Sequence, residues 1–387
     1  MTIKNIPMFK SVIDILAIAF ICLNVLAFEI PLFGIPLRFW VMIGLLGLTI
    51  IADRQSYFTP FFVRFILFAY GSWSILVIYS LLMGNELENV LACVRPLLMF
   101  MLIPSYKYAF SKYGEERYVK ALSLACIVLI AIFFVVLARV LADPSLIPDY
   151  DEKEEGLIII SKSPLGARIL IKTFVFLIPF AIYVMSKIKN AFFYLFFVLI
   201  LAVLVLSQTL GFIIPIIFFY FYILLRRKKI FAIAMSLFLS AAIVSSTAIY
   251  FSDALDTKEE SADVKSMQVD NAFKDMNIVS LFFGRGIGCE FKKFDSRGIT
   301  ESTIEVAAIQ MFQWGGFIFT VPILFVYILP GVIAMRKQEG STLQILGLSQ
   351  VGLFIASLSN PYLWGGTGLL LNVLILASPK FNKLFKA

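Results

Sequence analysis

Long apolar segments separated by short charged ones make up most of the chain. A helix needs about 20 apolar residues to cross the roughly 30 Å hydrocarbon core of a membrane. At this length the pattern predicts an all-α polytopic membrane protein with about twelve transmembrane helices. The predicted spans lie near residues 11–28, 36–52, 60–83, 88–104, 120–142, 168–186, 191–207, 210–225, 230–252, 306–335, 342–358 and 362–379.

Two apolar runs are too long for one span, and we predict that each forms a helical hairpin. Residues 191–225 contain no charged side chain and would make a single helix of about 52 Å at 1.5 Å per residue. Basic clusters flank this run on both sides and favour the same, cytoplasmic side, so the segment Ser207–Gly211 is predicted to be a turn. The run 341–379 divides in the same way at Ser359–Pro361.

The distribution of charge predicts the orientation. The predicted cytoplasmic segments carry mostly Lys and Arg, whereas the outward segments carry more acids than bases. We therefore expect both termini in the cytoplasm and the whole chain, 1–387, to form a single integral membrane domain. Two outward loops are long, at 143–167 and 253–305, and loops of this length are usually functional or disordered. We therefore expect the working surface to be the outer face.

Composition agrees with the membrane assignment and excludes some chemistry. Hydrophobic residues make up 60% of the chain and charged residues 15%, with a mean hydropathy of +0.93. A soluble domain has about a quarter charged residues. The net charge of +8 comes from short clusters between spans, so we expect no nucleic-acid partner. The chain has no histidine, which excludes a histidine base or metal ligand, and its cysteines show no paired spacing for a disulfide framework or zinc site.

Two cations begin the predicted span 168–186. Arg168 and Lys172 are four residues apart and would project from one face of a helix. Either they extend to the lipid headgroups, or they form a doubly basic platform for a phosphate or pyrophosphate. Arg285 and Arg297, in the large outer loop, are further candidate phosphate ligands.

The segment Leu281–Gly288 contains glycines at alternate positions, Gly284, Gly286 and Gly288. Glycine permits tight turns and lets a ligand approach the backbone closely. The alternative is a plain turn between two short helices of the loop. The motif follows no Rossmann strand, so it does not indicate a dinucleotide site.

Two acids precede the predicted span 306–335. Glu301 and Glu305 are one helical turn apart and would share a helix face at the membrane boundary. They either complement the helix dipole, or one of them acts as a general base towards a sugar hydroxyl. A carboxylate is the most plausible base in a chain without histidine; Glu290 or an acid within 149–155 is the alternative.

Together these stretches resemble the Wzy-type O-antigen and exopolysaccharide polymerases of the O-antigen ligase and polymerase superfamily. The resemblance depends on the span number, the two outer loops, the Ser207–Gly211 turn, the glycine-rich Leu281–Gly288 and Glu301-Ser302 followed by Gln313–Phe317. Leu210 stands where the family's turn commonly has arginine, which argues against a ligand role for this turn. The family's ligases depend on a histidine, so its absence favours a polymerase.

The resemblance implies a GT-C-type glycosyltransferase of lipopolysaccharide biosynthesis in the bacterial inner membrane. It would polymerise undecaprenyl-diphosphate-linked oligosaccharide repeat units on the periplasmic face, alongside a polysaccharide chain-length regulator. The residues expected to hold the diphosphate are Arg168, Lys172, Arg285 and Arg297, and the expected base is Glu301 or Glu305. We expect no metal and no cofactor, because cations that neutralise a diphosphate already make it an adequate leaving group and the outer loops lack an obvious aspartate pair.

Three other functions stay open at this point: a flippase for lipid-linked oligosaccharides, an O-antigen ligase, and a non-catalytic scaffold or chain-length partner. A flippase is expected to have two comparable halves and charges along a central cavity. In this chain the polar residues are concentrated in two unequal outer loops.

Overall fold

The described part of the chain is mostly helical and contains long apolar helices, as expected of a helical membrane protein. The computed structural model describes residues 7–26, 31–147, 158–163, 166–187, 191–207, 209–227, 266–267, 269–274, 276–292, 300–301, 306–358 and 366–382. Its α-helices are α1 (Pro7–Leu26), α2 (Leu37–Asp53), α3 (Pro60–Leu82), α4 (Leu87–Val94), α5 (Ile103–Tyr113), α6 (Glu115–Ala142), α7 (Leu177–Lys187), α8 (Ala191–Leu206), α9 (Leu210–Arg226), α12 (Ile278–Phe283), α13 (Ala307–Met335), α14 (Thr342–Ser357), α15 (Gly366–Ala377) and α16 (Pro379–Asn382). Short 3-10 helices are η2 (Arg54–Phe58), η3 (Arg95–Leu102), η4 (Pro144–Leu146) and η5 (Phe174–Phe176).

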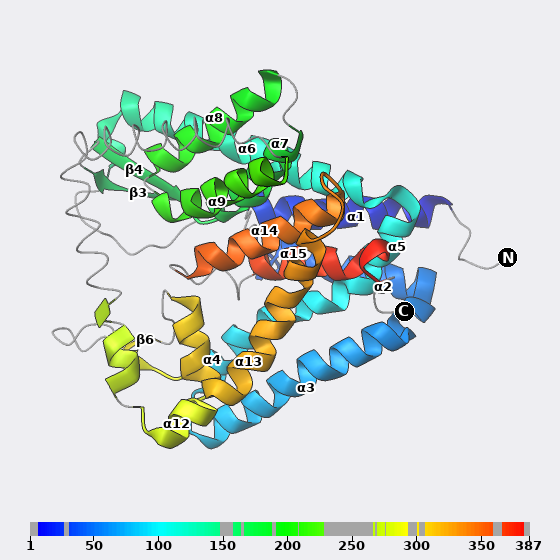
Figure 1. Ribbon diagram of the computed structural model, residues 1–387, viewed down its shortest axis with the longest axis vertical. Coiled ribbons are helices and arrows are strands. Elements are labelled where there is room, and N and C mark those ends of the chain that lie inside the picture. Colours follow the sequence, from blue (N-terminus) through cyan, green and yellow to red (C-terminus); the bar gives the residue numbers. More distant parts are fainter. Residues whose placement is uncertain are drawn as a thin grey trace.

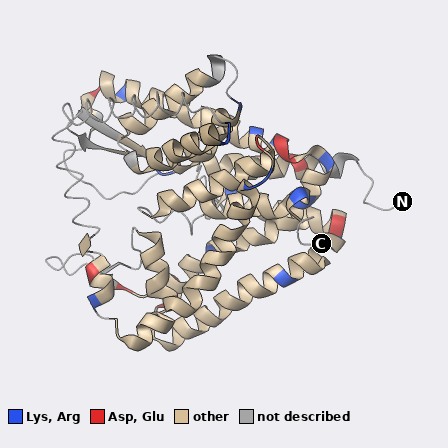
Figure 2. Ribbon diagram, viewed as in Figure 1, with Lys and Arg blue, Asp and Glu red and all other residues tan. Residues whose placement is uncertain are grey.

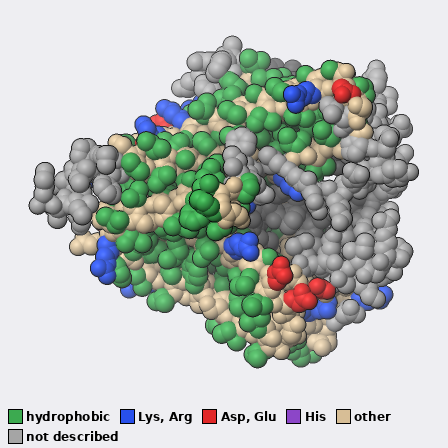
Figure 3. Space-filling view, turned by 180° about the vertical axis from the view of Figure 1, so that it is seen from behind, with side chains coloured by type: hydrophobic (Ala, Val, Ile, Leu, Met, Phe, Trp, Pro, Cys, Tyr) green, Lys and Arg blue, Asp and Glu red, His purple; other side chains and the backbone are tan. Residues whose placement is uncertain are grey.

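Helices occupy the described parts of the predicted spans apart from the start of 168–186, and the span 230–252 lies outside the described residues, as does the predicted turn 359–361. By length and composition the helices able to cross a membrane are Pro60–Leu82, Leu87–Tyr113, Glu115–Ala142 and Ala307–Met335, and shorter apolar helices cover the other described spans. Charged residues are sparse along the middle of the long helices (Figure 2). The predicted turn at Ser207–Gly211 is confirmed, because α8 ends at Leu206 and α9 begins at Leu210. Apolar side chains cover much of the molecular surface (Figure 3), as expected of a protein that is embedded in lipid.

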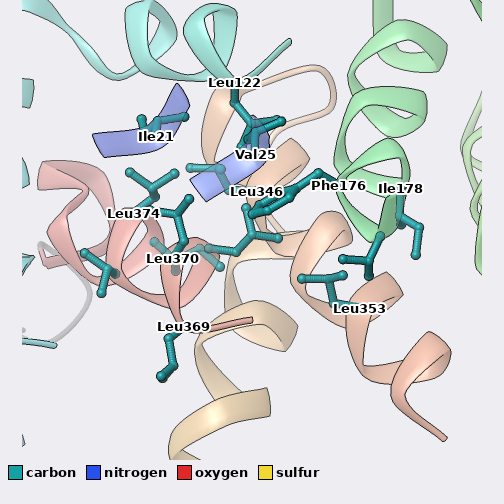
Figure 4. Close-up of a cluster of buried hydrophobic side chains, with 14 of the residues drawn as sticks. Ile21, Val25, Leu122, Phe176, Ile178, Leu346, Leu353, Leu369, Leu370 and Leu374 are labelled. Atoms are coloured by element: carbon teal, nitrogen blue, oxygen red, sulfur yellow. The ribbon is translucent and has the colours of Figure 1, made fainter. Parts of the chain in front are cut away.

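The buried core lies where α1, α6, α7, α14 and α15 meet (Figure 4). Ile21 of α1, Leu122 of α6 and Leu370 of α15 are among its fully enclosed side chains. A Cβ at Gly347 of α14 would lie 2.3 Å from the backbone nitrogen of Met335, so α14 packs directly against the α13 backbone only because residue 347 is glycine. This packing fixes α13, the helix that reaches the candidate site.

Amides from α14 and α15 bind a backbone carbonyl of α13 close to Pro330. Pro330 lies inside this helix and removes a donor from its hydrogen-bond ladder. Nearby, the Tyr327 carbonyl accepts hydrogen bonds of 3.1 Å from both Gln350 Nε2 and Asn372 Nδ2. Buried backbone groups of a membrane protein need such internal partners, because lipid offers none.

The beginning of α1 and the end of α15 lie at one end of the molecule, whereas β3, β4 and α12 lie at the other (Figure 1). Polar contacts join helices at the first end. Arg117 Nη2 of α6 lies 2.7 Å from Asp14 Oδ2 of α1, and the Tyr118 hydroxyl donates to Asp14 Oδ1 at 2.7 Å. Ser378 Oγ, after α15, donates to Glu115 Oε1 at 2.7 Å.

Three short antiparallel strand pairs depart from the all-α prediction: β1 (Pro31–Leu32) with β2 (Ile35–Pro36), β3 (Ile158–Ser163) with β4 (Gly166–Ile171), and β5 (Phe291–Lys292) with β6 (Thr300–Glu301). The predicted span 168–186 is therefore wrong at its start, because its first residues belong to β4 and α7 begins at Leu177. Isoleucine is favoured in strands, and the pairing of β3 with β4 accompanies burial of Ile169 and Ile171.

Candidate functional site

The segment 284–290, which we call the glycine loop, lies between the start of α13 and the α3–α4 turn. On the α13 side, the Arg285 N–H donates to the Gln313 carbonyl at 2.7 Å and the Gly286 N–H to the Trp314 carbonyl at 2.9 Å. The helix bends at Gly316, just after Gln313 and Trp314, so it leaves the carbonyls of these two residues free. The loop supplies their hydrogen bonds. The loop is therefore fixed to α13 through its backbone.

Polar side chains at the end of α3 and in the α3–α4 turn hold the other side of the glycine loop. The Tyr79 hydroxyl donates to the Gly284 carbonyl at 2.9 Å, and Ser80 Oγ accepts from the Ile287 N–H at 2.6 Å. Asn85 Nδ2 donates to the carbonyls of Arg285 at 3.0 Å and Ile287 at 3.2 Å. The backbone of residues 284–287 is thus bound on both sides by the rest of the protein.

The three glycines are required by this packing. All have positive φ: +78° at Gly284, +88° at Gly286 and +72° at Gly288. A Cβ at Gly284 would lie 2.3 Å from the Trp314 carbonyl oxygen, and one at Gly288 would lie 2.9 Å from the Val90 nitrogen. The close approach that the motif predicted is therefore made by the protein's own backbone, and these glycines do not form an open cradle for a ligand.

The anchored loop presents one cation and one acid. Among the described residues, the partly exposed Arg285 side chain has no hydrogen-bond or ion-pair partner. Glu290 is exposed, and Asn89 Nδ2 lies 3.5 Å from its Oε1. Between them, the Cys289 thiol is only 3% exposed; burial raises its pKa to about 12, against a smaller lowering by Arg285. The loop thus combines a fixed backbone with an accessible guanidinium.

The strand pair β5–β6 places Glu301 next to the end of the glycine loop. Phe291, the residue after Glu290, is paired with Glu301. The prediction that Glu301 and Glu305 share a helix face is wrong, because Glu301 belongs to an extended strand and α13 begins only at Ala307. Glu305 lies outside the described residues.

The helical pairing predicted for Arg168 and Lys172 is also wrong. Arg168 lies in β4, opposite Ser161, and the exposed Lys172 follows the end of that strand. The i, i+4 relation of a helix does not apply to extended backbone. In Figure 1 the β3–β4 hairpin and the α12–β6 region lie at the same end of the molecule but apart from each other. Arg297 lies outside the described residues.

Several site residues were not predicted. Tyr79, Ser80 and Asn85 hold the glycine loop, and their only sequence signal is that they are polar residues at the end of one apolar span and in the short turn before the next. Gln313 is 1% exposed, and neither its Oε1 nor its Nε2 has a hydrogen-bond partner among the residues that the structure describes. Trp314 Nε1 is likewise buried without a partner. Unpaired buried groups cost about 1–3 kcal/mol each, so a polar molecule that reached them would be stabilised.

Within the described residues, no group of three or more Cys, Asp or Glu is placed to hold a metal ion. The chemistry that the site offers is a guanidinium, nearby carboxylates and buried amide and indole groups able to form hydrogen bonds. Comparisons of the chain with protein-family models, with curated proteins and with solved structures found no match.

Proposed function

We propose that this protein is a metal-independent GT-C-type glycosyltransferase that polymerises undecaprenyl-diphosphate-linked oligosaccharide repeat units. The proposal includes a twelve-span topology, cytoplasmic termini and a bacterial inner-membrane location. It rests on the apolar helices, on the resemblance to Wzy-type polymerases, and on the chemistry of the glycine loop.

The observation that carries the proposal is the state of Arg285. Its N–H and C=O are both bound by other segments, whereas its guanidinium has no partner among the residues the structure describes. A guanidinium donates two parallel hydrogen bonds to phosphate oxygens, and a preorganised cation stabilises the negative charge that develops on a departing diphosphate. A cation on a fixed backbone needs little reorganisation during the reaction.

The reaction proposed here is transfer of the growing glycan. A hydroxyl of a new lipid-linked unit attacks the anomeric carbon of the growing chain, the bond from that carbon to the diphosphate oxygen breaks, and the diphosphate keeps the electron pair. Glu301 or Glu305 accepts the hydroxyl proton as general base. Arg285, with Arg297, holds the lipid diphosphate, and Arg168 and Lys172, which lie apart from Arg285 at the β3–β4 hairpin, add positive charge at the same end of the molecule. The unpaired Gln313 amide offers one acceptor and two donors to sugar hydroxyls.

The test uses purified full-length protein in nanodiscs with its lipid-diphosphate-linked repeat unit as the only substrate. The wild type should give a ladder of products that differ by whole repeats. Arg285→Ala should abolish the ladder and Arg285→Lys should restore it only in part, because lysine keeps the charge but loses the bidentate geometry. Lys274→Ala is the matched control, since Lys274 is an exposed cation of the same predicted outer loop.

The base is tested separately with Glu301→Gln and Glu305→Gln, of which one should lose chain extension. A normal ladder from Arg285→Ala refutes the role of this residue. Absence of a ladder from wild-type protein with an intact, matched substrate refutes polymerase activity, and translocation and core-transfer assays then decide between a flippase and a ligase.

A further inference from the structure

A groove on the lipid-facing surface lies between α6, α7 and α8, away from the glycine loop. Its volume is about 270 Å³. The residues that line it are Lys120, Ser123, Leu124, Ile127, Phe180, Tyr183, Val184 and Phe196. Phe180 and Phe196 meet edge to face across it, with ring centroids 5.9 Å apart.

The groove walls are apolar and open outward. Phe180 and Val184 are buried in the wall of α7, whereas Leu124 of α6 is 61% exposed at the rim. The Ser123 hydroxyl is already used, because it donates to the Val119 carbonyl at 2.8 Å. A hydrocarbon chain therefore fits these walls, and a polar ligand would find few groups to bind inside them.

One end of the groove is basic. Lys120 precedes Leu124 by one helical turn, and its Nζ lies 3.1 Å from Glu116 Oε1 in an exposed ion pair. Lys187, at the end of α7, acts electrostatically on the same carboxylate. Two cations therefore face one acid at this end, which leaves an excess of positive charge. An exposed pair of this kind is weak and is readily shared with another anion.

The groove has the polarity of a phospholipid. From Lys120 to Ile127 it follows α6 for about 10 Å, at 1.5 Å per residue, from a basic end into an apolar one. The basic end lies where α6 begins, at the end of the molecule that also holds the start of α1 (Figure 1). Basic pockets between membrane helices bind anionic headgroups.

We propose that this groove binds one anionic phospholipid, with an acyl chain between α6, α7 and α8 and the headgroup phosphate at Lys120. The site does not depend on the catalytic proposal, because no groove residue belongs to the glycine loop. Since residues of α6, α7 and α8 all line the groove, the lipid would join α6 to the other two helices.

The experiment is native mass spectrometry of the detergent-purified chain with phosphatidylglycerol or phosphatidylcholine of identical acyl composition. The wild type should bind phosphatidylglycerol about five-fold more tightly, the effect of one cation beside an anionic headgroup. Lys120→Ala should remove that preference and keep the weaker binding common to both lipids. Leu124→Trp, which fills the groove from an exposed position, should lose binding of both lipids.

Two matched controls accompany these variants. Val135→Trp places the same indole on α6 at a residue that is also 61% exposed but lies outside the groove, and Lys112→Ala removes another exposed cation. Both should bind lipid as the wild type does. Unchanged binding in Leu124→Trp would overturn the location of the site, and a lipid preference retained in Lys120→Ala would overturn the role of Lys120.

Discussion

Replacement of Gly286 by alanine tests whether the glycine loop is held as described. The residue has φ +88°, where an L-residue costs about 1–2 kcal/mol. The new Cβ would also lie 2.5 Å from Asn85 Nδ2 and 2.8 Å from Ser80 Cα, and Ser80 belongs to the α3 backbone, which cannot move aside easily. Overpacking of this kind costs about 1–3 kcal/mol. The free energy of the docked loop should therefore rise by about 2–5 kcal/mol relative to that of an open loop.

The matched control is Gly84→Ala. Gly84 has a similar φ of +84°, but nothing lies within 4 Å of a Cβ built there. Gly84 lies outside the glycine loop, so its conformational cost is the same whether the loop is docked or open, and it lacks the clash. The opening equilibria of the two variants should therefore differ by about 2–5 kcal/mol, or about 30- to 5,000-fold.

The assay is the rate at which a maleimide alkylates Cys289, mapped by peptide mass spectrometry in the folded protein. In the docked loop this thiol is buried and its pKa is about 12, so the reactive thiolate is scarce. Opening exposes the thiol and returns its pKa towards about 8.5. Gly286→Ala should react faster than Gly84→Ala by the factor given above. Equal rates in the two variants would refute the steric argument.

Three further outcomes follow from the contacts. Asn85→Ala should raise the Cys289 alkylation rate, because the loop loses two hydrogen bonds to its carbonyls at a cost of about 1–3 kcal/mol. Arg117→Ala should lower the melting temperature in detergent, because it leaves the buried Asp14 carboxylate without its cation. The expected cost is about 1–3 kcal/mol, a figure reduced because the arginine side chain is 51% exposed. Adding Asp14→Asn should restore part of the loss, and a double variant without this rescue would contradict the argument. Gly347→Ala should destabilise by about 1–3 kcal/mol through its contact with α13, measured against Gly44→Ala, whose Cβ would meet only a side-chain atom at 3.6 Å.

The helices were predictable from the sequence because most of them coincide with a long stretch of apolar residues. The turn at Ser207–Gly211 was equally predictable, since length and flanking charge together exclude a single span. The β3–β4 hairpin was missed because Ile169–Ile171 also extends an apolar run that reads as a span. Its signal was the pair of isoleucine-rich segments on either side of the residues Pro164 and Gly166, types that are typical of turns.

The candidate site was only partly predictable. The alternating glycines indicated close approach, and the structure places them against backbone. Their partners Ser80 and Asn85 lie about 200 positions earlier in the chain, and nothing in the local pattern of a single sequence connects such distant segments. Phe291 and Glu301 are only ten positions apart, but each belongs to a strand of two residues, which is too short to give a strand pattern in the sequence.

The distance along the chain between the α3–α4 turn and the glycine loop also has a consequence for biosynthesis. A ribosome adds about 5–20 residues per second, so Ser80 and Asn85 emerge roughly 10–40 s before the segment that pairs with them. During that interval their polar groups are bound by water or by another protein at the membrane surface. Docking of the loop is therefore a late event of membrane assembly, and a chain truncated before Gly284 would keep these groups accessible to chaperones and proteases that recognise unfinished products.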